Sequence, residues 1–172
     1  MDISVRSATP EDDEVTEQIE VAADALLIDR FRAVDWPPPT SPHERTSAPG
    51  FVLVAESLGD EDDAVPGVVG FVHVMEIDGH AHLEQLSVLP AYGRRGIGRR
   101  LVEAALAEAR RRGHSEITLR TYVDVPWNAP FYASCGFVES EPETPLLRGL
   151  VHVETALGLF AHGPRVQMTA TL

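Results

Sequence analysis

Apolar residues recur along this chain with two different periods. Short runs rich in valine, isoleucine, threonine and aromatic residues predict β-strands, and they span residues 2–8, 51–57, 68–77, 80–89, 115–123 and 165–172. Apolar residues that return every three or four positions predict helices at 10–32 and 98–112, and a shorter helix is expected at 128–136. Helices and strands are therefore mixed along the chain, which predicts an α+β fold.

The connections between these elements decide how the strands pair. The charged segment 58–67 reads as a turn, so the strands on either side of it form an antiparallel hairpin, and the strand at 80–89 extends the meander. The helix at 98–112 is a crossover that allows the strands before and after it to run parallel. No repeat or second domain is visible, and we expect one domain over residues 1–172.

Two segments match neither period. Residues 33–50 contain five prolines, and we expect a long loop without regular structure. Long loops in compact domains are usually functional or mobile. The structure of residues 140–163 is left open.

The charge of the chain limits its partners. The net charge of −13 over 172 residues opposes binding to nucleic acid, because phosphates require a positive surface. A cationic partner is easier to attract. The basic residues are all arginines, and half of them lie between Arg94 and Arg112.

The location of the protein is predicted from what its sequence lacks. The single cysteine, Cys135, has no partner for an internal disulfide, which favours a reducing compartment. The first residues have neither a basic leader nor an apolar core, and no apolar run approaches the roughly 18 residues that span a membrane. We therefore expect a cytoplasmic protein without a membrane partner.

The segment VLPAYGRRGIGRRL, residues 88–101, joins a predicted strand to a predicted helix through three glycines. Such a turn directs backbone N–H groups and the helix dipole at one point and favours an anion, most naturally phosphate. The alternative is that the glycines only tighten the turn. Neither a Walker loop nor a dinucleotide fingerprint fits, because Arg99 and Arg100 follow Gly98 and Leu101 stands where a third glycine is required.

Two blocks together resemble the GCN5-related N-acetyltransferases. The acyl-CoA loop of that family, Q/R-x-x-G-x-G/A, falls on Gly93–Gly98, with glycine in place of the first residue. The block NAPFYASCGF, Asn128–Phe137, is similar to a second family segment that ends in Gly-Phe. The resemblance implies a splayed, mostly antiparallel sheet flanked by helices, with acetyl-CoA as co-substrate. It implies that acetyl-CoA binds at Leu86, Val88, Gly93, Arg94, Arg95, Gly96, Ile97, Gly98, Arg99 and Asn128.

The resemblance also implies two catalytic residues. Glu84 occupies the strand position where several family members carry a general base, and Tyr132 stands where they carry the acid that reprotonates the departing thiolate. The alternatives are a solvent-facing glutamate and a packed tyrosine. Strand alternation places His82, Glu84 and Leu86 on one face unless a bulge intervenes. Asn128 either bonds the pantetheine arm or caps the short helix.

Other chemistry is less favoured by the sequence. The spacing of His80, His82 and Glu84 allows a metal on one strand face, but the further histidine motif of such sites is missing, and no metal is expected. Cys135 has no histidine near it in sequence and is expected to be a buried structural thiol rather than a nucleophile.

The acceptor is expected to be a small, cationic primary amine. It would enter from the side formed by the first helix, the proline-rich loop with Trp36 and the region after Phe137. Asp29, Asp35 and the general acidity of the chain favour a cationic acceptor over an acidic one. A protein N-terminus or a lysine side chain is the alternative acceptor, and a non-catalytic acyl-CoA sensor is the alternative function. Exposed strand edges make a homodimer a fair hypothesis.

Overall fold

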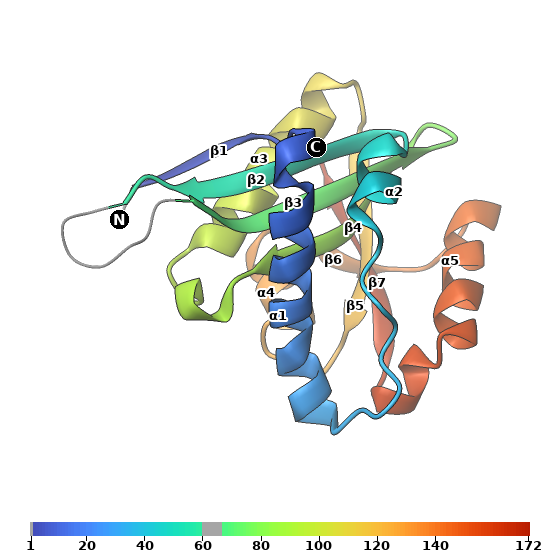
Figure 1. Cartoon of the computed structure of the whole chain (residues 1–172). Coiled ribbons are helices and arrows are strands. Elements are labelled where there is room, and N and C mark those ends of the chain that lie inside the picture. The colour runs from blue at the N-terminus through green and yellow to red at the C-terminus, as the bar shows by residue number, and fades with distance from the viewer. Residues whose placement is uncertain (1, 60–66) are drawn as a thin grey trace.

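The computed structural model describes residues 2–59 and 67–172. The strands are β1 (Ile3–Ser7), β2 (Gly50–Ser57), β3 (Gly67–Ile77), β4 (His80–Val88), β5 (Glu116–Tyr122), β6 (Val138–Ser140) and β7 (Arg165–Thr171). They form one sheet of seven strands in the order β1-β2-β3-β4-β5-β7-β6 (Figure 1). The predicted α+β fold with a mixed, mostly antiparallel sheet is confirmed. The predicted turn at 58–67 lies mostly outside the described residues.

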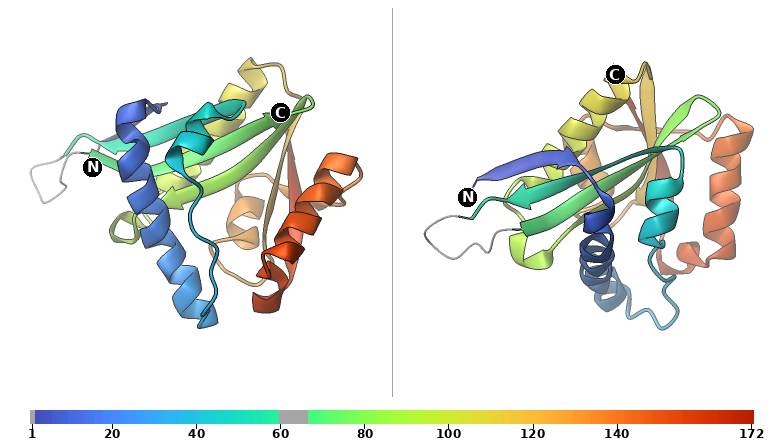
Figure 2. Two further views of the ribbon diagram at one scale, coloured as in Figure 1. Left: turned by 45° about the vertical axis from the view of Figure 1, so that its right-hand side comes forward. Right: turned by 45° about the horizontal axis from the view of Figure 1, so that its top comes forward.

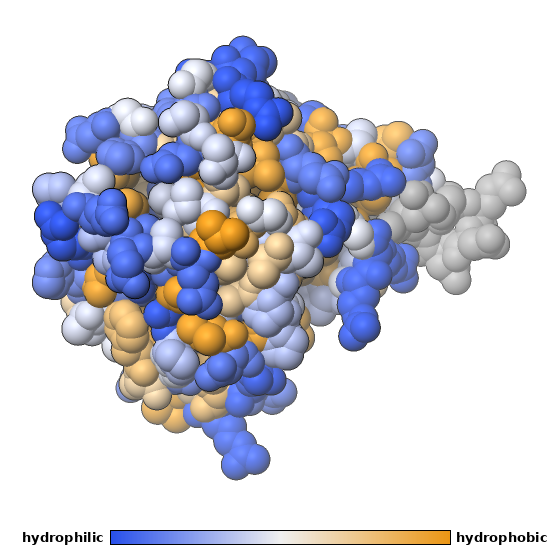
Figure 3. All heavy atoms as spheres, turned by 180° about the vertical axis from the view of Figure 1, so that it is seen from behind, coloured by the Kyte–Doolittle hydropathy of each residue, from blue (hydrophilic) through white to orange (hydrophobic). Residues whose placement is uncertain are grey.

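The helices are α1 (Asp13–Phe31), α2 (Pro42–Ser47), α3 (Ile97–Arg111), α4 (Ala129–Ser134) and α5 (Pro145–Ala156). In Figures 1 and 2, α1 and α2 lie on one face of the sheet, α3 and α4 on the other, and α5 stands beside β7. Figure 3 shows the face opposite to that of Figure 1, where hydrophilic residues surround a smaller apolar area. None of the helices among the described residues has the length and apolar content to cross a membrane.

Side chains that alternate along the strands pack into two hydrophobic cores, one on each face of the sheet. Val72 and Val74 of β3 pack with Leu101 of α3 in the larger core, and the neighbouring Phe71 packs with Ile19 of α1 in the smaller one. The opposite directions of adjacent residues follow from the two-residue period of a strand. The sheet is therefore covered on both faces by helices that the periodic pattern predicts.

The proline-rich segment is more ordered than predicted. The expectation of a loop without regular structure over residues 33–50 is wrong, because α2 lies within that segment. Pro42 occupies the first turn of α2, where its missing N–H would be unpaired in any case. A further reason is Arg45, which is 2% exposed and bonds to Glu20 of α1. The prolines before Pro42 remain in an irregular connection.

The region left open in the sequence, residues 140–163, contains α5 and a 3-10 turn at Leu159–His162. Thr144 caps α5, since its hydroxyl accepts the N–H of Leu147 at 3.2 Å, and Pro145 occupies the first turn. Gly158 follows the helix with φ of 71°, a left-handed conformation that favours glycine. The region thus supplies one complete amphipathic helix beside the sheet.

Among the strands that the structure describes, β4 and β5 alone pair in parallel, and this pair opens into a gap. The two strands pair over three positions and end their pairing at Leu83 with Leu119. Both continue beyond that point, to Val88 and Tyr122. Among the described residues, the main-chain groups of β4 after Leu83 consequently have no strand paired with them on the side facing β5, and a ligand has access to them.

Candidate active site

A cleft of about 1060 Å³ lies at the gap between β4 and β5. Residues 84–88 of β4 and 120–122 of β5 line it, together with parts of α1, α3, α4, α5 and the connection after α1. The cleft therefore lies where the sheet splays and where most helices converge.

Glu84 lies at a β-bulge. Val74 of β3 pairs with Leu83 and the adjacent His73 pairs with Gln85, so Glu84 has no partner on β3. An extra residue of this kind reverses the alternation of side chains. Leu83 and Leu86, three residues apart, accordingly both contact the core beneath α3. The predicted shared face of His82 and Leu86 is wrong, and the cause is the bulge.

The bulge and the gap together turn Glu84 into the cleft, where 39% of its side chain remains exposed. Burial by the surrounding walls raises the pKa of Glu84, and the negative charge of Glu154 raises it further. The ring of His82 lies 4.0 Å away, from Nε2 to Glu84 Oε2. Burial lowers the pKa of His82 to about 4, so this ring is neutral at physiological pH, and its Nδ1 lies 2.8 Å from Thr118 Oγ1.

The open edge of β4 presents main-chain groups to the cleft. The N–H of Leu89 donates to Val69 O at 2.8 Å, which makes this pair a hydrogen-bonded position of the antiparallel ladder. Bonded and non-bonded positions alternate, so Val88 and Leu86 direct their N–H and C=O groups away from β3. Both residues line the cleft. Their amides are donors and acceptors for an extended ligand along this edge.

The glycine-rich loop closes one end of the cleft. Arg94 and Gly96 have φ of 60° and 79°, and α3 begins immediately afterwards at Ile97. The first N–H groups of a helix have no partner within it and carry its positive dipole end. The loop residues that line the cleft are Gly93, Arg94, Gly96, Ile97, Gly98 and Arg99. Arg95 is outside this lining, and its guanidinium lies 5.6 Å from the ring centroid of Tyr92.

Arg99 links the loop to α4. Its guanidinium donates to the carbonyl and to the hydroxyl of Ser134, at 3.0 and 2.9 Å. These bonds hold the start of α3 beside α4, which carries Tyr132. Arg99 thus contributes positive charge to the cleft from a fixed position.

Asn128 lines the cleft and orients α4. Its Oδ1 accepts the hydroxyl of Thr121 at 2.9 Å and the N–H of Tyr122 at 3.4 Å, both on β5. The alternative role as a side-chain cap of α4 is wrong, because the carbonyl turns toward β5 and makes no capping bond. The side chain anchors the first turn of α4 to the sheet.

Tyr132 lies against the same cleft and is 8% exposed. Its ring packs edge-on against Phe131 and Phe137, with centroids 5.2 and 5.8 Å away. Burial raises its pKa, with a further contribution from nearby Cys135. Within the described part of the chain its hydroxyl engages no hydrogen bond, so the proton is retained and available to a ligand.

Sequence reasoning missed a set of buried charges on the other side of the cleft. Glu154 of α5 is 7% exposed, accepts a bond from Arg165 at 2.8 Å and lies 3.0 Å from Arg120 Nε. On α1, Glu20 pairs with Arg45 and Asp24 accepts the indole N–H of Trp36 at 3.1 Å. The sequence does contain a sign of the acidic pair on α1, because Glu20 and Asp24 are four residues apart and therefore share one face of the predicted helix. Glu154 gave none, because its segment was not recognised as a helix.

The alternative chemistry does not assemble in the described ranges 2–59 and 67–172. No three histidine, cysteine, aspartate or glutamate side chains converge there as metal ligands would. Cys135 is half-buried rather than fully buried, and burial raises its pKa, which lowers the fraction of reactive thiolate.

The chain is similar to known proteins both in sequence profile and in fold. The profile of the acetyltransferase (GNAT) family matches residues 21–137 of this chain. That range contains the bulge at Glu84, the glycine-rich loop and the helix that carries Tyr132. Residues 138–172, with α5 and Glu154, lie beyond the match.

Several solved structures share the fold over nearly their whole length. The ribosomal-protein-S18-alanine N-acetyltransferase of Escherichia coli has a TM-score of 0.70 at 18% identity, covering 99% of this chain and 94% of its own. The PaiA N-acetyltransferase of Thermoplasma acidophilum, solved with coenzyme A, has 0.68 at 16%, covering 100% of both chains. A GCN5-related N-acetyltransferase of Rhodopseudomonas palustris has 0.63 at 25%, covering 100% and 99%.

Proposed function

The chain belongs to the acetyltransferase (GNAT) family, and on that premise we propose that it transfers the acetyl group of acetyl-CoA directly to a primary amine of a small cationic molecule. The main observation in support of this proposal is that the glycine-rich loop, the carboxylate of Glu84 and the hydroxyl of Tyr132 line the same cleft. These are an anion-binding site, a base and an acid, and amine acetylation requires all three.

Acetyl-CoA is proposed to lie along the open edge of β4. Its pyrophosphate would accept hydrogen bonds from the free N–H groups at the start of α3, and Arg94 and Arg99 would supply positive charge. The extended pantetheine arm would pair with the outward-facing amide of Leu86 and the C=O of Val88, with the amide of Asn128 opposite, and the N–H of Val88 would face the thioester. The loop recognises phosphate mainly through its backbone, so glycine at position 93 is compatible with this role.

The transfer has three proton movements and one acyl movement. Glu84 takes a proton from the acceptor ammonium, directly or through a water, and the free amine attacks the thioester carbonyl. The Val88 N–H stabilises the developing oxyanion. When the intermediate collapses, the carbon–sulfur bond breaks and Tyr132 donates its proton to the thiolate. The attacking nitrogen then loses its second proton, which returns Tyr132 to its protonated form, directly or through a water. The raised pKa of Glu84 suits its role, since a more basic carboxylate accepts a proton readily. The raised pKa of Tyr132 keeps the phenol protonated before the transfer but also makes it a weaker acid.

The test of this proposal separates an enzyme from an acyl-CoA sensor. Acetyl-CoA is titrated into the protein by calorimetry beside ATP and NAD, and thiol release is then followed with a panel of amines. We expect saturable binding of acetyl-CoA alone, and Tyr132→Phe should lower turnover by about 10²-fold with unchanged acetyl-CoA affinity. Binding without turnover for any amine would favour the sensor, and absence of binding would refute the proposal at its first step.

We further propose that the protein needs no metal ion, consists of one domain and can form a homodimer. The proton movements proposed for Glu84 and Tyr132 do not require a metal ion, so EDTA should leave turnover unchanged. The continuous sheet from β1 to β7 supports a single domain, and the edge strands β1 and β6 are the surfaces through which a homodimer would form. Light scattering of the purified chain measures its mass directly. A cytoplasmic location agrees with the lone thiol of Cys135.

A further inference from the structure

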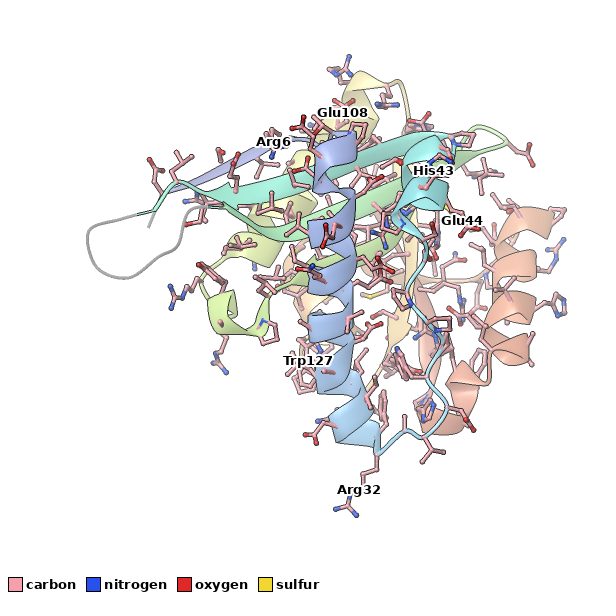
Figure 4. The ribbon with its side chains drawn as sticks, in the orientation of Figure 1. Arg6, Arg32, His43, Glu44, Glu108 and Trp127 are labelled. Atoms are coloured by element: carbon pink, nitrogen blue, oxygen red, sulfur yellow. The ribbon has the colours of Figure 1, made fainter. Side chains whose placement is uncertain are left out.

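The half of the cleft away from the glycine-rich loop has apolar walls that face an open space. Leu26 of α1 lines the cleft and is 44% exposed, and Val153 and Leu157, in and just after α5, line it and are 55% and 48% exposed. Figure 2 shows α1 and α5 on either side of the connection that follows α1, and Figure 4 draws the side chains around this connection. Large apolar side chains so exposed around a cavity are typical of a binding surface.

The two walls have the same composition although they are far apart in sequence. On α5, Leu150, Val153 and Leu157 share one helix face with Glu154, because their spacings are three and four residues. On α1, the apolar lining residues Ala23, Leu26 and Leu27 surround Asp24 in the same way. An acceptor between the walls therefore meets apolar surface at the sides and carboxylates at particular points.

The carboxylates in this half outnumber the guanidiniums by one. Four carboxylates belong to it: Glu20, Asp24, Glu84 and Glu154. Three guanidiniums neutralise most of them, because Arg45 pairs with Glu20, and Arg120 and Arg165 flank Glu154. Among the described residues, no arginine lies within ion-pair distance of Glu84 or Asp24. Burial raises the pKa of each of these two carboxylates, and a cation beside either of them would lower that pKa again.

We propose that the acceptor is a monoamine with an apolar body, such as an arylalkylamine, whose ammonium is received by Glu84 while its body lies between Leu26 and the pair Val153 and Leu157. This inference rests on the proposed acetyl transfer and narrows its acceptor. A single ammonium matches the single excess carboxylate, and a polyamine would place its further charges against apolar walls, where desolvation is costly. The volume of the cleft, which acetyl-CoA shares, suits a small molecule.

The test compares amines that differ in one property. 2-Phenylethylamine and ethanolamine each carry one ammonium, but only the first has an apolar body; spermidine has more charge and no ring, and an alanine-initiated tripeptide represents a protein N-terminus. We expect kcat/KM for 2-phenylethylamine to exceed that for each of the others by at least about tenfold. Equal values for 2-phenylethylamine and ethanolamine, or a preference for spermidine or the tripeptide, would overturn the proposal.

Variants locate the preference on the two walls. Leu26→Asn and Leu157→Asn should each lower kcat/KM for 2-phenylethylamine by roughly three- to tenfold and leave ethanolamine unchanged. Val21→Asn is the matched control, since Val21 is on the same helix as Leu26, is 52% exposed and does not line the cleft. An equal loss for both amines in the wall variants would assign them a structural role and refute the subsite.

Binding separates this inference from the function on which it rests. Both monoamines are titrated by calorimetry into the protein saturated with CoA. Tighter binding of 2-phenylethylamine without turnover of any amine would refute the acetyl transfer and retain the apolar subsite. Turnover of both amines with equal affinity would retain the acetyl transfer and refute the subsite.

Discussion

The two halves of the cleft recognise their ligands by different means. The half at the glycine-rich loop offers mainly main-chain groups: the N–H groups at the start of α3 and the outward-facing amides of Leu86 and Val88. The half between α1 and α5 offers side chains, with carboxylates set among exposed apolar residues. Main-chain recognition depends on backbone conformation and tolerates many substitutions, whereas side-chain recognition changes with each one. The first half is therefore suited to a constant ligand and the second to a ligand particular to this protein.

The largest expected effect comes from the carboxylate at the boundary of the two halves. Glu84→Gln removes the base and keeps the size of the side chain, so kcat/KM should fall by roughly 10²- to 10⁴-fold. Acetyl-CoA affinity, measured by calorimetry, should be unchanged because the loop is untouched. If acetyl-CoA affinity fell in parallel with turnover, the two halves would not be independent.

A smaller effect is expected from the backbone of the loop. Gly96 has φ of 79° and open space around the position of a Cβ, so Gly96→Val acts through backbone strain alone. We expect acetyl-CoA affinity to fall by roughly tenfold, at a cost near 1–2 kcal/mol, while the KM of the amine is retained.

Gly113→Val is the matched control for this variant. Gly113 also has a positive φ, of 93°, but follows the far end of α3 and does not line the cleft. It should lower the melting temperature without changing acetyl-CoA affinity. Equal weakening of acetyl-CoA binding by both variants would indicate general destabilisation.

The pH profile is expected to shift with the charge on α5. The negative charge of Glu154 raises the pKa of Glu84, so Glu154→Gln removes that contribution and leaves the positive Arg165 to lower the pKa further. Glu84 acts as a base only when it is deprotonated. The acid limb of the kcat/KM profile should consequently move to lower pH, and stopped-time assays from pH 5 to 9 measure it. A shift to higher pH would contradict the electrostatic coupling of the two glutamates.

The smallest effect concerns the glycine that departs from the family pattern. A Cβ at Gly93 would lie 3.1 Å from Pro90 O, which already accepts the Gly93 N–H at 3.0 Å. Gly93→Gln restores the usual side chain but crowds this turn, and we expect acetyl-CoA affinity to change by less than about threefold. A large gain in affinity would show that side chains, rather than the backbone, dominate recognition in this half.

The sequence predicted the local half of the site better than the assembled half. Gly93–Gly98 and Asn128–Phe137 are contiguous motifs, and their surroundings follow from the strand, turn and helix patterns next to them. Glu154 could not be placed, because it reaches the cleft only through the packing of α5, a helix that was not recognised in the sequence. Arg45 was hidden for a related reason, since prolines around a short helix suggest a loop.

The bulge illustrates a second limit of prediction. Glu84 was singled out by its position, but the alternation rule misplaced Leu86 relative to His82, because a bulge arises from the register between β3 and β4. One strand read alone contains no information on how many residues oppose it. The face of each residue after Glu84 therefore had to come from the pairing.

The use of arginine near the cofactor loop has a chemical consequence of its own. A lysine amine beside an acetyl thioester is itself an acceptor, and each turnover would carry a risk of modifying the protein in place of the substrate. Guanidinium groups such as those of Arg94 and Arg99 remain protonated at pH values where enzymes work and do not act as nucleophiles. Since the chain has no lysine at all, its side chains offer no amine to the acetyl donor that we propose it binds, and the enzyme cannot acetylate itself at a lysine.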